Sequence, residues 1–467
     1  MKYGLSEEQL KQIQDIISSY DEIEEAILFG SRAMDTYKEA SDVDIALKGK
    51  NVNASLAARL KYRLEEDTYL PFFFDFIAYP TITNQALKKH IDTKGVSIYR
   101  TGWKECKMGD VIIFGNGKAR PKTEGEIPIY GGNGILGYCD QFNYQDETII
   151  IGRVGAYCGS VFYKNKPIWV SDNALSAKPK ERNNTKFLFY FLKNLELNQF
   201  AEGSSHPLVT QTLLNSIDIE IPEKETEQKA IASVLSSLDD KIDLLHRQNK
   251  TLEAMAETLF RQWFVEEAEE DWEEKPLSFF GDIICGKTPS KKIHSYFNGK
   301  IPFIKIPDMH GNIFVFETFD SLTEEGMYSQ SNKTLPSKSI CVSCIATVGL
   351  VSMNAIESQT NQQINSIIPK KEYHRYFLYF FMKSYYDLLH SMACGGTATL
   401  NLNTGSFSKI PVPYPGNKIL LAFQAQVQPF FDKIFTSQKQ IRTLEKLRNT
   451  LLPKLMSGEV RVEYDAN

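Results

Sequence analysis

Three aspartates near the start of the chain have the type and spacing of a divalent-metal site. Asp42 and Asp44 stand two residues apart in an apolar stretch, so on a β-strand both carboxylates would share one face. Asp75 follows within an aromatic run, where a bare buried charge would be costly without a cation. Carboxylate oxygens are ligands that Mg²⁺ prefers. The sequence therefore predicts a Mg²⁺ site formed by Asp42, Asp44 and Asp75.

A Gly-Ser pair precedes these aspartates and predicts a phosphate-binding turn. Gly30 permits close approach of the backbone to a ligand, and Ser31 with its amide offers donors to phosphate oxygens. We therefore expect a nucleoside triphosphate to bind beside the acidic strand.

The segment from about 20 to 100 resembles the minimal nucleotidyltransferase domain of the polymerase-β class, in a version similar to antitoxins that adenylylate a partner toxin. The likeness rests on 28–33, on 41–46, and on the short motifs 82–84 and 90–92. It implies that Gly30, Ser31 and Arg32 hold the nucleotide. It also implies that Asp42 and Asp44 bind two metal ions, and that Asp75 is the general base for the attacking hydroxyl.

One position departs from that family. Where the family usually has glycine soon after Arg32-Ala33, this chain has Asp35. The added carboxylate would either weaken nucleotide binding or point outward. Two hypotheses stay open for this segment, a working nucleotidyltransferase and an α/β domain that keeps its acidic strand without turnover.

The rest of the chain contains an internal repeat. Asp240-Lys241-Ile242 recurs as Asp432-Lys433-Ile434 and Leu252-Glu253 recurs as Leu444-Glu445, at one constant offset, inside long amphipathic helices predicted over 226–264 and 420–456. Each helix closes a β-rich stretch with glycine-broken strands, at 127–130 and 148–151 in the first copy and at 301–304 and 340–348 in the second. One further helix is expected in each copy, at 186–194 and 373–386.

Apolar residues recur every seven positions in both long helices, the pattern of a coiled-coil seam. The two rows of the first helix are Ile231, Leu238, Leu245, Leu252, Leu259 and Leu235, Ile242, Asn249, Ala256, Trp263; those of the second are Phe423, Phe430, Ser437, Leu444, Leu451 and Val427, Ile434, Ile441, Arg448, Leu455. Because neither helix could bury its stripe alone, we predict that the two helices pack on each other.

Two features of these helices need a further explanation. Asn249 within the apolar seam is either a device that fixes the register or a solvated edge, and we favour the register. Apolar residues at the helix ends exceed what a two-helix rod can cover, which predicts an interaction surface. They are Phe260, Trp263, Phe264, Leu451, Leu452 and Leu455.

These observations predict an α+β protein of several domains. The expected parts are an α/β nucleotidyltransferase-like domain (1–102), a first β-rich module (103–222), a first helix (223–268), a second β-rich module (269–415) and a second helix (416–463), with the helices forming an antiparallel coiled coil. In the first domain we expect helices at 7–19, 55–66 and 84–94, and strands at 26–29, 43–47 and 72–77. We call the two β-rich stretches module 1 and module 2.

The repeated part, from about 104 to 463, resembles type I restriction-modification specificity subunits. The residues that carry this likeness in order are Gly109-Asp110, 127–134, 152–155, Pro222, 227–232, 238–242, 252–255 and 452–460. The resemblance implies that modules 1 and 2 are target recognition domains, each reading one half of a split double-stranded DNA site. It implies two methyltransferase subunits as partners, which carry S-adenosylmethionine, together with restriction subunits. The specificity part itself would need no cofactor, whereas Mg²⁺ belongs to the N-terminal domain.

Polar side chains near glycine turns are what direct reading of DNA requires, with Arg for guanine, Asn or Gln for adenine, and Lys for phosphate. The candidates are Lys118, Arg120, Lys122, Asn133, Arg153, Tyr157 and His206 in module 1, and Lys287, Lys291, Lys292, Lys305, Thr347, Asn361 and Gln362 in module 2. Across both modules we find no nucleophile paired with a base, which favours a reader over a catalyst. The alternative is a nucleotidyltransferase, transferring AMP to a partner protein, that the repeat targets to DNA.

Composition agrees with a folded protein of several domains. The 467 residues carry 24% charged and 42% hydrophobic side chains and a net charge of -5, with the acidity concentrated on the first long helix and the N-terminal region. No apolar run is long enough to cross a membrane, and the start of the chain lacks the features of a signal peptide, so we expect a cytoplasmic protein without a membrane partner. The scattered cysteines, including Cys341 and Cys344, are interpreted as buried thiols.

Overall fold

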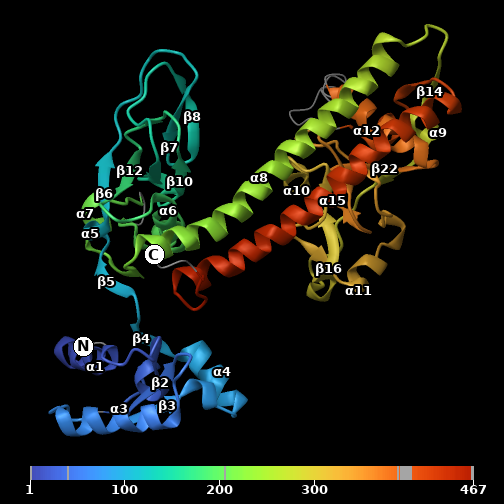
Figure 1. Ribbon diagram of the computed structural model, residues 1–467. Helices are drawn as coiled ribbons and strands as arrows, with labels where there is room; N and C mark the ends of the chain where they lie inside the picture. The colour runs from blue at the N-terminus through green and yellow to red at the C-terminus, as the bar shows by residue number, and fades with distance from the viewer. Residues whose placement is uncertain (1–2, 39–40, 204–206, 387–388, 390–401, 464–467) are drawn as a thin grey trace. The chain divides into compact units, whose positions relative to one another are not determined.

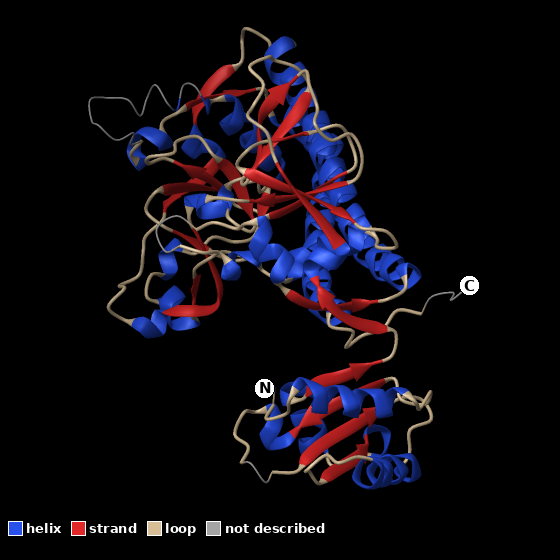
Figure 2. Ribbon diagram, turned by 90° about the vertical axis from the view of Figure 1, so that its left-hand side faces the viewer, coloured by secondary structure: helices blue, strands red, loops and turns tan. Residues whose placement is uncertain are grey.

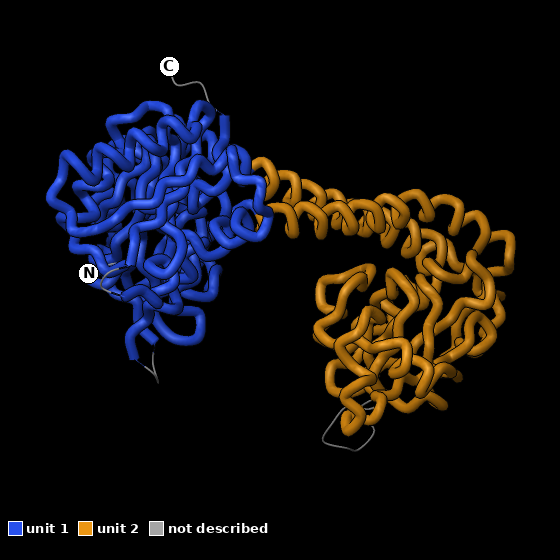
Figure 3. Tube along the Cα trace, turned by 90° about the horizontal axis from the view of Figure 1, so that it is seen from below, with its two compact units in different colours: residues 1–236, 451–467 blue, residues 237–450 orange. Residues whose placement is uncertain are grey.

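The computed structural model describes residues 3–38, 41–203, 207–386, 389 and 402–463. By its contacts the chain divides into two compact units, one of residues 1–236 with 451–467 and the other of residues 237–450 (Figure 3). Within the described ranges, no helix combines the length and apolar character needed to cross a lipid bilayer.

The N-terminal domain is a mixed four-stranded sheet with helices on both faces (Figure 2). Its elements are α1 Glu7–Ser18, β1 Glu25–Phe29, α2 Gly30–Ala33, β2 Val43–Lys48, α3 Ala54–Asp67, β3 Phe74–Ala78, α4 Gln85–Lys94 and β4 Val96–Arg100. The predicted helices and strands are confirmed, and β4 and α2 are additions. Strand order is β3-β2-β1-β4, with β2 and β3 parallel and the other pairs antiparallel. Side chains of α1 and α3 pack on one face and those of α4 on the other.

Module 1 contains a larger and a smaller sheet, and helix α6 packs on the larger one (Figure 1). Its elements are β5 Trp103–Lys107, α5 Met108–Val111, β6 Ile112–Asn116, β7 Ile127–Gly131, β8 Gly134–Cys139, β9 Thr148–Gly152, β10 Val161–Lys164, β11 Trp169–Val170, β12 Ala174–Pro179, α6 Thr185–Asn194, α7 Gln211–Ser216 and β13 Asp218–Pro222. The larger sheet has the order β10-β9-β12-β6 and the smaller β11-β7-β8, while β13 pairs separately with β5.

Module 2 repeats this strand order with one additional strand. Its elements are β14 Glu273–Pro276, α9 Leu277–Phe280, β15 Gly281–Cys285, β16 Phe297–Ile304, α10 Ile306–Met309, β17 Phe314–Val315, β18 Ser321–Leu322, α11 Glu324–Tyr328, β19 Ile340–Ser343, β20 Val351–Asn354, β21 Gln359–Thr360, β22 Ile364–Pro369, α12 Arg375–Ser384, α14 Thr404–Ser408 and β23 Pro411–Tyr414. The order β20-β19-β22-β15 matches β10-β9-β12-β6, with β17 added at the edge. The parallel pair β16 and β21 likewise matches β7 and β11. The expected strand at 340–348 is wrong in length, because β19 ends at Ser343.

The two long helices are α8 Glu225–Arg261 and α15 Asn417–Met456. Within the second unit they pack antiparallel, as the pairs Asp239 with Arg448 and Phe260 with Phe423 demonstrate. Ile242, Leu245 and Ile441 are buried between them, which confirms the predicted seam. Arg448, a charged residue in the apolar row, is accommodated because its Nη1 donates to Asp239 Oδ1 at 2.7 Å.

The helix ends do not carry the predicted exposed patch. Phe260 and Phe264 are buried in the core of module 2 against α12, and Leu455 is buried in the core of module 1. Trp263, Leu451 and Leu452 are partly buried against the same cores. That prediction is wrong because each helix end belongs to the core of a module, which the heptad pattern does not reveal.

A buried polar layer interrupts the seam. Asn249 is 6% exposed, which excludes a solvated edge and leaves the register explanation. The antiparallel register brings it level with Ser437, which is 1% exposed. Asn249 Oδ1 and Ser437 Oγ have no hydrogen-bond partner among the described residues. Each such atom costs on the order of 1–3 kcal/mol, so this layer lowers the stability of the helix pair.

Replacing this layer by apolar residues should therefore stabilise the protein. For Asn249→Leu we expect an increase of about 1–3 kcal/mol, seen as a rise in the apparent Tm of roughly 2–8 °C by differential scanning fluorimetry. The matched control Leu245→Asn puts the same polar group one turn away and should lower the Tm. A lower Tm for Asn249→Leu would show that the asparagine makes a stabilising contact.

Candidate functional sites

The aspartates of the N-terminal domain meet at one edge of its sheet. In the parallel pair β2 and β3, Asp44 stands directly opposite Asp75. Asp42 precedes β2 and is exposed. Burial raises the pKa of Asp44 above its ordinary value, the Asp75 and Asp42 charges raise it further, and Arg32 opposes them. Ionised Asp44 is thus held in an unfavourable, partly desolvated position that a bound cation would relieve.

Gly30 is built tightly against this acidic edge. Phe29 ends β1 opposite Asp44, and Gly30 follows with φ of +73°. A Cβ at Gly30 would lie 2.4 Å from Asp44 Oδ2, so only glycine fits here without displacing the carboxylate. Ser31 follows in α2 and is half-buried. The structure therefore brings the glycine turn and the acidic strand together, as the spacing predicts.

Asp75 lies in a different environment from the one expected. Its neighbours Phe74 and Phe76 pack into the core on the opposite face, and the Asp75 side chain is 62% exposed. Lys61 Nζ of α3 contacts Asp75 Oδ1 at 3.2 Å. The expectation of a carboxylate buried among aromatics is wrong because side chains alternate along the strand. Sequence spacing gave no signal for Lys61, since it comes from another element.

Arg32, which is predicted to contact the nucleotide, is buried and bonded to the backbone. Its side chain is 1% exposed, and its Nε, Nη1 and Nη2 atoms all donate to backbone carbonyls, two of them to Ser41. Nε also donates to the carbonyl of Asp42 at 3.1 Å. The guanidinium therefore fixes the loop that carries Asp42, and nucleotide contact would require these bonds to break.

Asp35, the departure from the family pattern, is exposed and has φ of +57°. This is the left-handed region that glycine adopts most easily and that aspartate tolerates better than most residues. The position explains why glycine suits it, and the Asp35 side chain points to solvent.

Metal geometry at this edge is incomplete. In the part of the chain that the structure describes, no three His, Cys, Asp or Glu side chains are gathered closely enough to form a metal site. The prediction that Asp42, Asp44 and Asp75 bind Mg²⁺ remains a prediction. Cys341 and Cys344 are buried in two different clusters, and burial raises the pKa of Cys341 to about 12 and that of Cys344 to about 11, as expected of inert thiols.

Most of the predicted DNA contacts lie on exposed loops of the two modules. Side chains with exposed positions are Lys118, Arg120, Lys122, Asn133, Tyr157, Lys287, Lys291, Lys292, Thr347 and Gln362. Arg153 is partly buried, and its Nε has no partner within the described residues. His206 lies outside the described residues. Residues Gly132–Gly137 have the glycine spacing of a dinucleotide-binding turn. In the structure they form the turn between the paired strands β7 and β8 and the first part of β8, and a strand follows the turn where such a site would have a helix.

Three candidates in module 2 make internal side-chain contacts. Gln362 is one of them, because its Oε1 accepts from Thr288 Oγ1 at 2.8 Å. Asn361 is 7% exposed, its Nδ2 donates to Gln363 Oε1 at 2.8 Å and its Oδ1 accepts from the Gln363 amide. Lys305 forms an ion pair with Asp320. Asn361 and Lys305 both remain predictions as DNA contacts, and either contact would have to replace these internal bonds.

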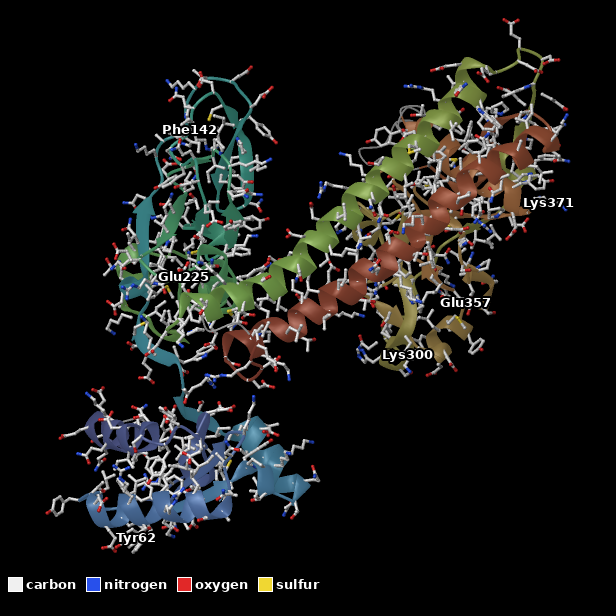
Figure 4. The ribbon with its side chains drawn as sticks, in the orientation of Figure 1. Tyr62, Phe142, Glu225, Lys300, Glu357 and Lys371 are labelled. Carbon is white, nitrogen blue, oxygen red and sulfur yellow. The ribbon has the colours of Figure 1, made fainter. Side chains whose placement is uncertain are left out.

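The sequence did not single out several exposed apolar residues near the candidate loops. Ile135, Tyr138 and Phe142 are 48%, 56% and 50% exposed in and after β8. Figure 4 shows Phe142 at the tip of module 1, near the loops beyond β8. In module 2, Phe319 is 97% exposed before β18.

Two family profiles match different parts of the chain. The profile described as "Type I restriction modification DNA specificity domain" matches residues 100–254 and again 269–450. A second profile, "Polymerase beta, Nucleotidyltransferase", matches residues 11–102.

Individual relatives cover most of the chain. Over 470 residues it is 37% identical to the Type I restriction enzyme HindI specificity subunit of Haemophilus influenzae, with 83% of this chain and 96% of that protein covered. The MjaIX specificity subunit of Methanocaldococcus jannaschii is 29% identical over 337 residues, covering 65% of this chain and 76% of that protein. The crystal structure of a type I restriction-modification S subunit from M. genitalium shares the fold, with a TM-score of 0.56 at 18% identity over 76% of this chain and 96% of that chain.

The acidic edge generates a pH-dependent prediction. A carboxyl whose pKa is raised in the folded state contributes stability below its ordinary value of 3.8, and this contribution is lost as pH rises through the raised pKa. At pH 7 we therefore expect Asp44→Asn to raise the apparent Tm, and the gain to shrink as pH falls toward 3.8. Asp67→Asn, at the exposed end of α3, is the control and should show no gain. Equal Tm values for Asp44→Asn and wild type at pH 7 would contradict the claim that ionised Asp44 destabilises the folded state.

Proposed function

The chain belongs to the type I restriction-modification DNA specificity family, and we propose that modules 1 and 2 each read one half of a bipartite double-stranded DNA site. The observation that carries this proposal is the duplication itself. Two sheets of matching strand order each precede a long helix, so the chain offers two similar heads. A split site is the target that two such heads require.

The chemistry of the exposed loops supports reading without catalysis. Lysine and arginine side chains on the loops after β6 and β15 offer charge to phosphates, while Asn133 and Gln362 offer amides to base edges. The base chemistry is assigned to partners. We assign to this chain DNA, methyltransferase and restriction subunits as partners, with two methyltransferase copies carrying S-adenosylmethionine, one for each half of the repeat.

The helix pair is the proposed spacer between half-sites. An α-helix rises about 1.5 Å for each residue, so its length sets a fixed distance along the duplex. The buried seam and the Asp239–Arg448 pair hold α8 and α15 in one register. The gap between the half-sites would then follow from helix length and not from the loops.

A change of helix length should therefore change the gap. Inserting one heptad into α8 and one into α15, at seam positions level with each other, adds about 10 Å, or about three base pairs at 3.4 Å each. Sequencing of modified bases in a host that expresses the chain with its methyltransferase should show a split motif for wild type. The insertion should lengthen the gap and leave both half-sites unchanged.

The control for this experiment is an insertion of the same length in the exposed loop before β14, which should leave the motif as it was. A continuous motif, or half-sites that change with helix length, would contradict the proposal.

For the N-terminal domain the proposed function is nucleotidyl transfer, favoured by the packing of Gly30 against Asp44 and by the position of Asp44 opposite Asp75 on the neighbouring strand. The raised pKa of Asp44 fits a site for a divalent cation, with Asp42 and Asp44 as its holders. Mg²⁺, when bound, would neutralise charge on the phosphates. Asp75 would take the proton of the attacking hydroxyl after Lys61 releases its carboxylate, and Ser31 would orient the phosphates.

Labelled ATP tests this second function. Incubated with Mg²⁺ and cell extract, the wild-type chain in its complex should transfer label to a protein or RNA acceptor, and Asp44→Asn should reduce transfer about 100-fold or more, since removing a charged ligand removes several kcal/mol of transition-state stabilisation. Asp67→Asn should retain transfer. Undiminished labelling by Asp44→Asn would assign the transfer to another protein. If the wild-type chain gave no labelling, the N-terminal domain would have a structural role without transfer activity.

A further inference from the structure

A Gly-Lys pair directly follows the first strand of the larger sheet in each module, Gly117-Lys118 after β6 and Gly286-Lys287 after β15. In module 1, Gly117 donates its amide to the carbonyl of Ala174 at 3.1 Å, and Lys118 donates its amide to Val170 at 3.0 Å. The Lys118 carbonyl accepts from Trp169 Nε1 at 3.2 Å. The backbone of Lys118 is thus bonded on both sides to the smaller sheet, although its side chain is exposed.

Module 2 repeats these bonds. Gly286 donates its amide to the carbonyl of Ile364 at 3.0 Å, and Lys287 donates its amide to Thr360 at 2.9 Å. The Lys287 carbonyl accepts from Gln330 Nε2 at 2.6 Å. Ala174 and Ile364 begin the equivalent strands β12 and β22, and Val170 and Thr360 end the equivalent strands β11 and β21. Lys118 and Lys287 therefore occupy the same place in the two modules.

The glycines explain why the backbone is held so closely. A Cβ at Gly117 would lie 1.8 Å from the carbonyl oxygen of Ser171, and one at Gly286 would lie 2.1 Å from that of Asn361. Both contacts are with backbone, which has little freedom to shift. The α-carbon of the following lysine is consequently fixed relative to the sheet, in contrast to a lysine on a free loop.

The two modules have the same residue type at Lys118 and Lys287, but differ at another pair of equivalent positions. Arg153 donates its amide to Asn173, and Cys344 donates its amide to Gln363, which makes Arg153 and Cys344 equivalent positions with different chemistry. A side chain that is identical in two heads carries no information that separates one half-site from the other. The phosphate backbone is the part of DNA that every half-site shares, and the lysine ammonium binds it as a point charge.

We propose that Lys118 and Lys287 are a matched pair of phosphate contacts that position each module on the duplex without reading bases. Neither side chain has an ion-pair partner among the described residues, unlike Lys305. This inference rests on the proposed DNA-reading function. It assigns orientation to the two lysines and leaves base discrimination to residues that differ between the modules, such as Arg153 and Gln362.

Binding measured against salt distinguishes the two roles. The chain in complex with its methyltransferase is titrated, by fluorescence anisotropy, onto a duplex with the intact split site and onto duplexes with either half scrambled. Lys118→Ala and Lys287→Ala should each weaken binding roughly tenfold and by the same factor on every duplex. Each should make the negative slope of log K against log salt less steep by about 0.9, and the double variant by about twice that.

Charge and position are controlled separately. Lys118→Arg and Lys287→Arg should restore the slope, because the charge is kept. Lys104→Ala removes an exposed lysine from β5 and should leave slope and affinity unchanged. Circular dichroism and co-purification with the methyltransferase verify that each variant is folded.

Two results would overturn the proposal. Loss of discrimination at one half-site in Lys118→Ala or Lys287→Ala would make that lysine a base reader, and an unchanged salt slope in folded alanine variants would remove it from the interface. A wild-type complex with no preference for the intact site would overturn the proposed split-site function alone, because the slopes of the variants still report on phosphate contact.

Discussion

The antiparallel contact between α8 and α15 is the constraint on which the rest of this protein depends. Neither helix can leave its apolar stripe in water, and burying one such side chain stabilises the pair by about 1.5–3 kcal/mol. The seam around Ile242, Leu245 and Ile441 is formed by helix against helix alone. At their ends the same helices enter the cores of the modules. The same two helices therefore contribute to their own seam and to the core of each module.

The duplication divides the work between a shared frame and differing loops. Strand order, the parallel pairing in the smaller sheet and the Gly-Lys turn are common to both modules. Exposed aromatic residues differ, with Tyr138 in β8 of module 1 and Phe319 in the loop before β18 of module 2. A frame fixed by backbone hydrogen bonds tolerates changes of loop side chains, because their exchange removes no core contact. This arrangement suits a protein whose two heads must recognise different sequences from the same geometry.

The N-terminal domain depends on a different physical effect. Asp44 is held near Asp42 and Asp75 in a partly buried position, and Arg32 fixes the loop before β2 from inside the fold. Clustered like charges lower stability, and they persist where a cation or a reaction uses them. The close packing of Gly30 on Asp44 is consistent with a surface shaped for a ligand.

The sequence by itself determined most helices and strands of the N-terminal domain, the repeat, the heptad seam and the meeting of Gly30 with Asp44, because periodicity and local spacing decide these features. It did not determine that Asn361 would be buried or that Lys61 would neutralise Asp75. Nor did it place Phe264 in a module core or show that Lys118 and Lys287 are equivalent. Such properties arise from contacts between segments distant in the chain, and only the tertiary structure decides which side chains those contacts bury, pair or leave exposed.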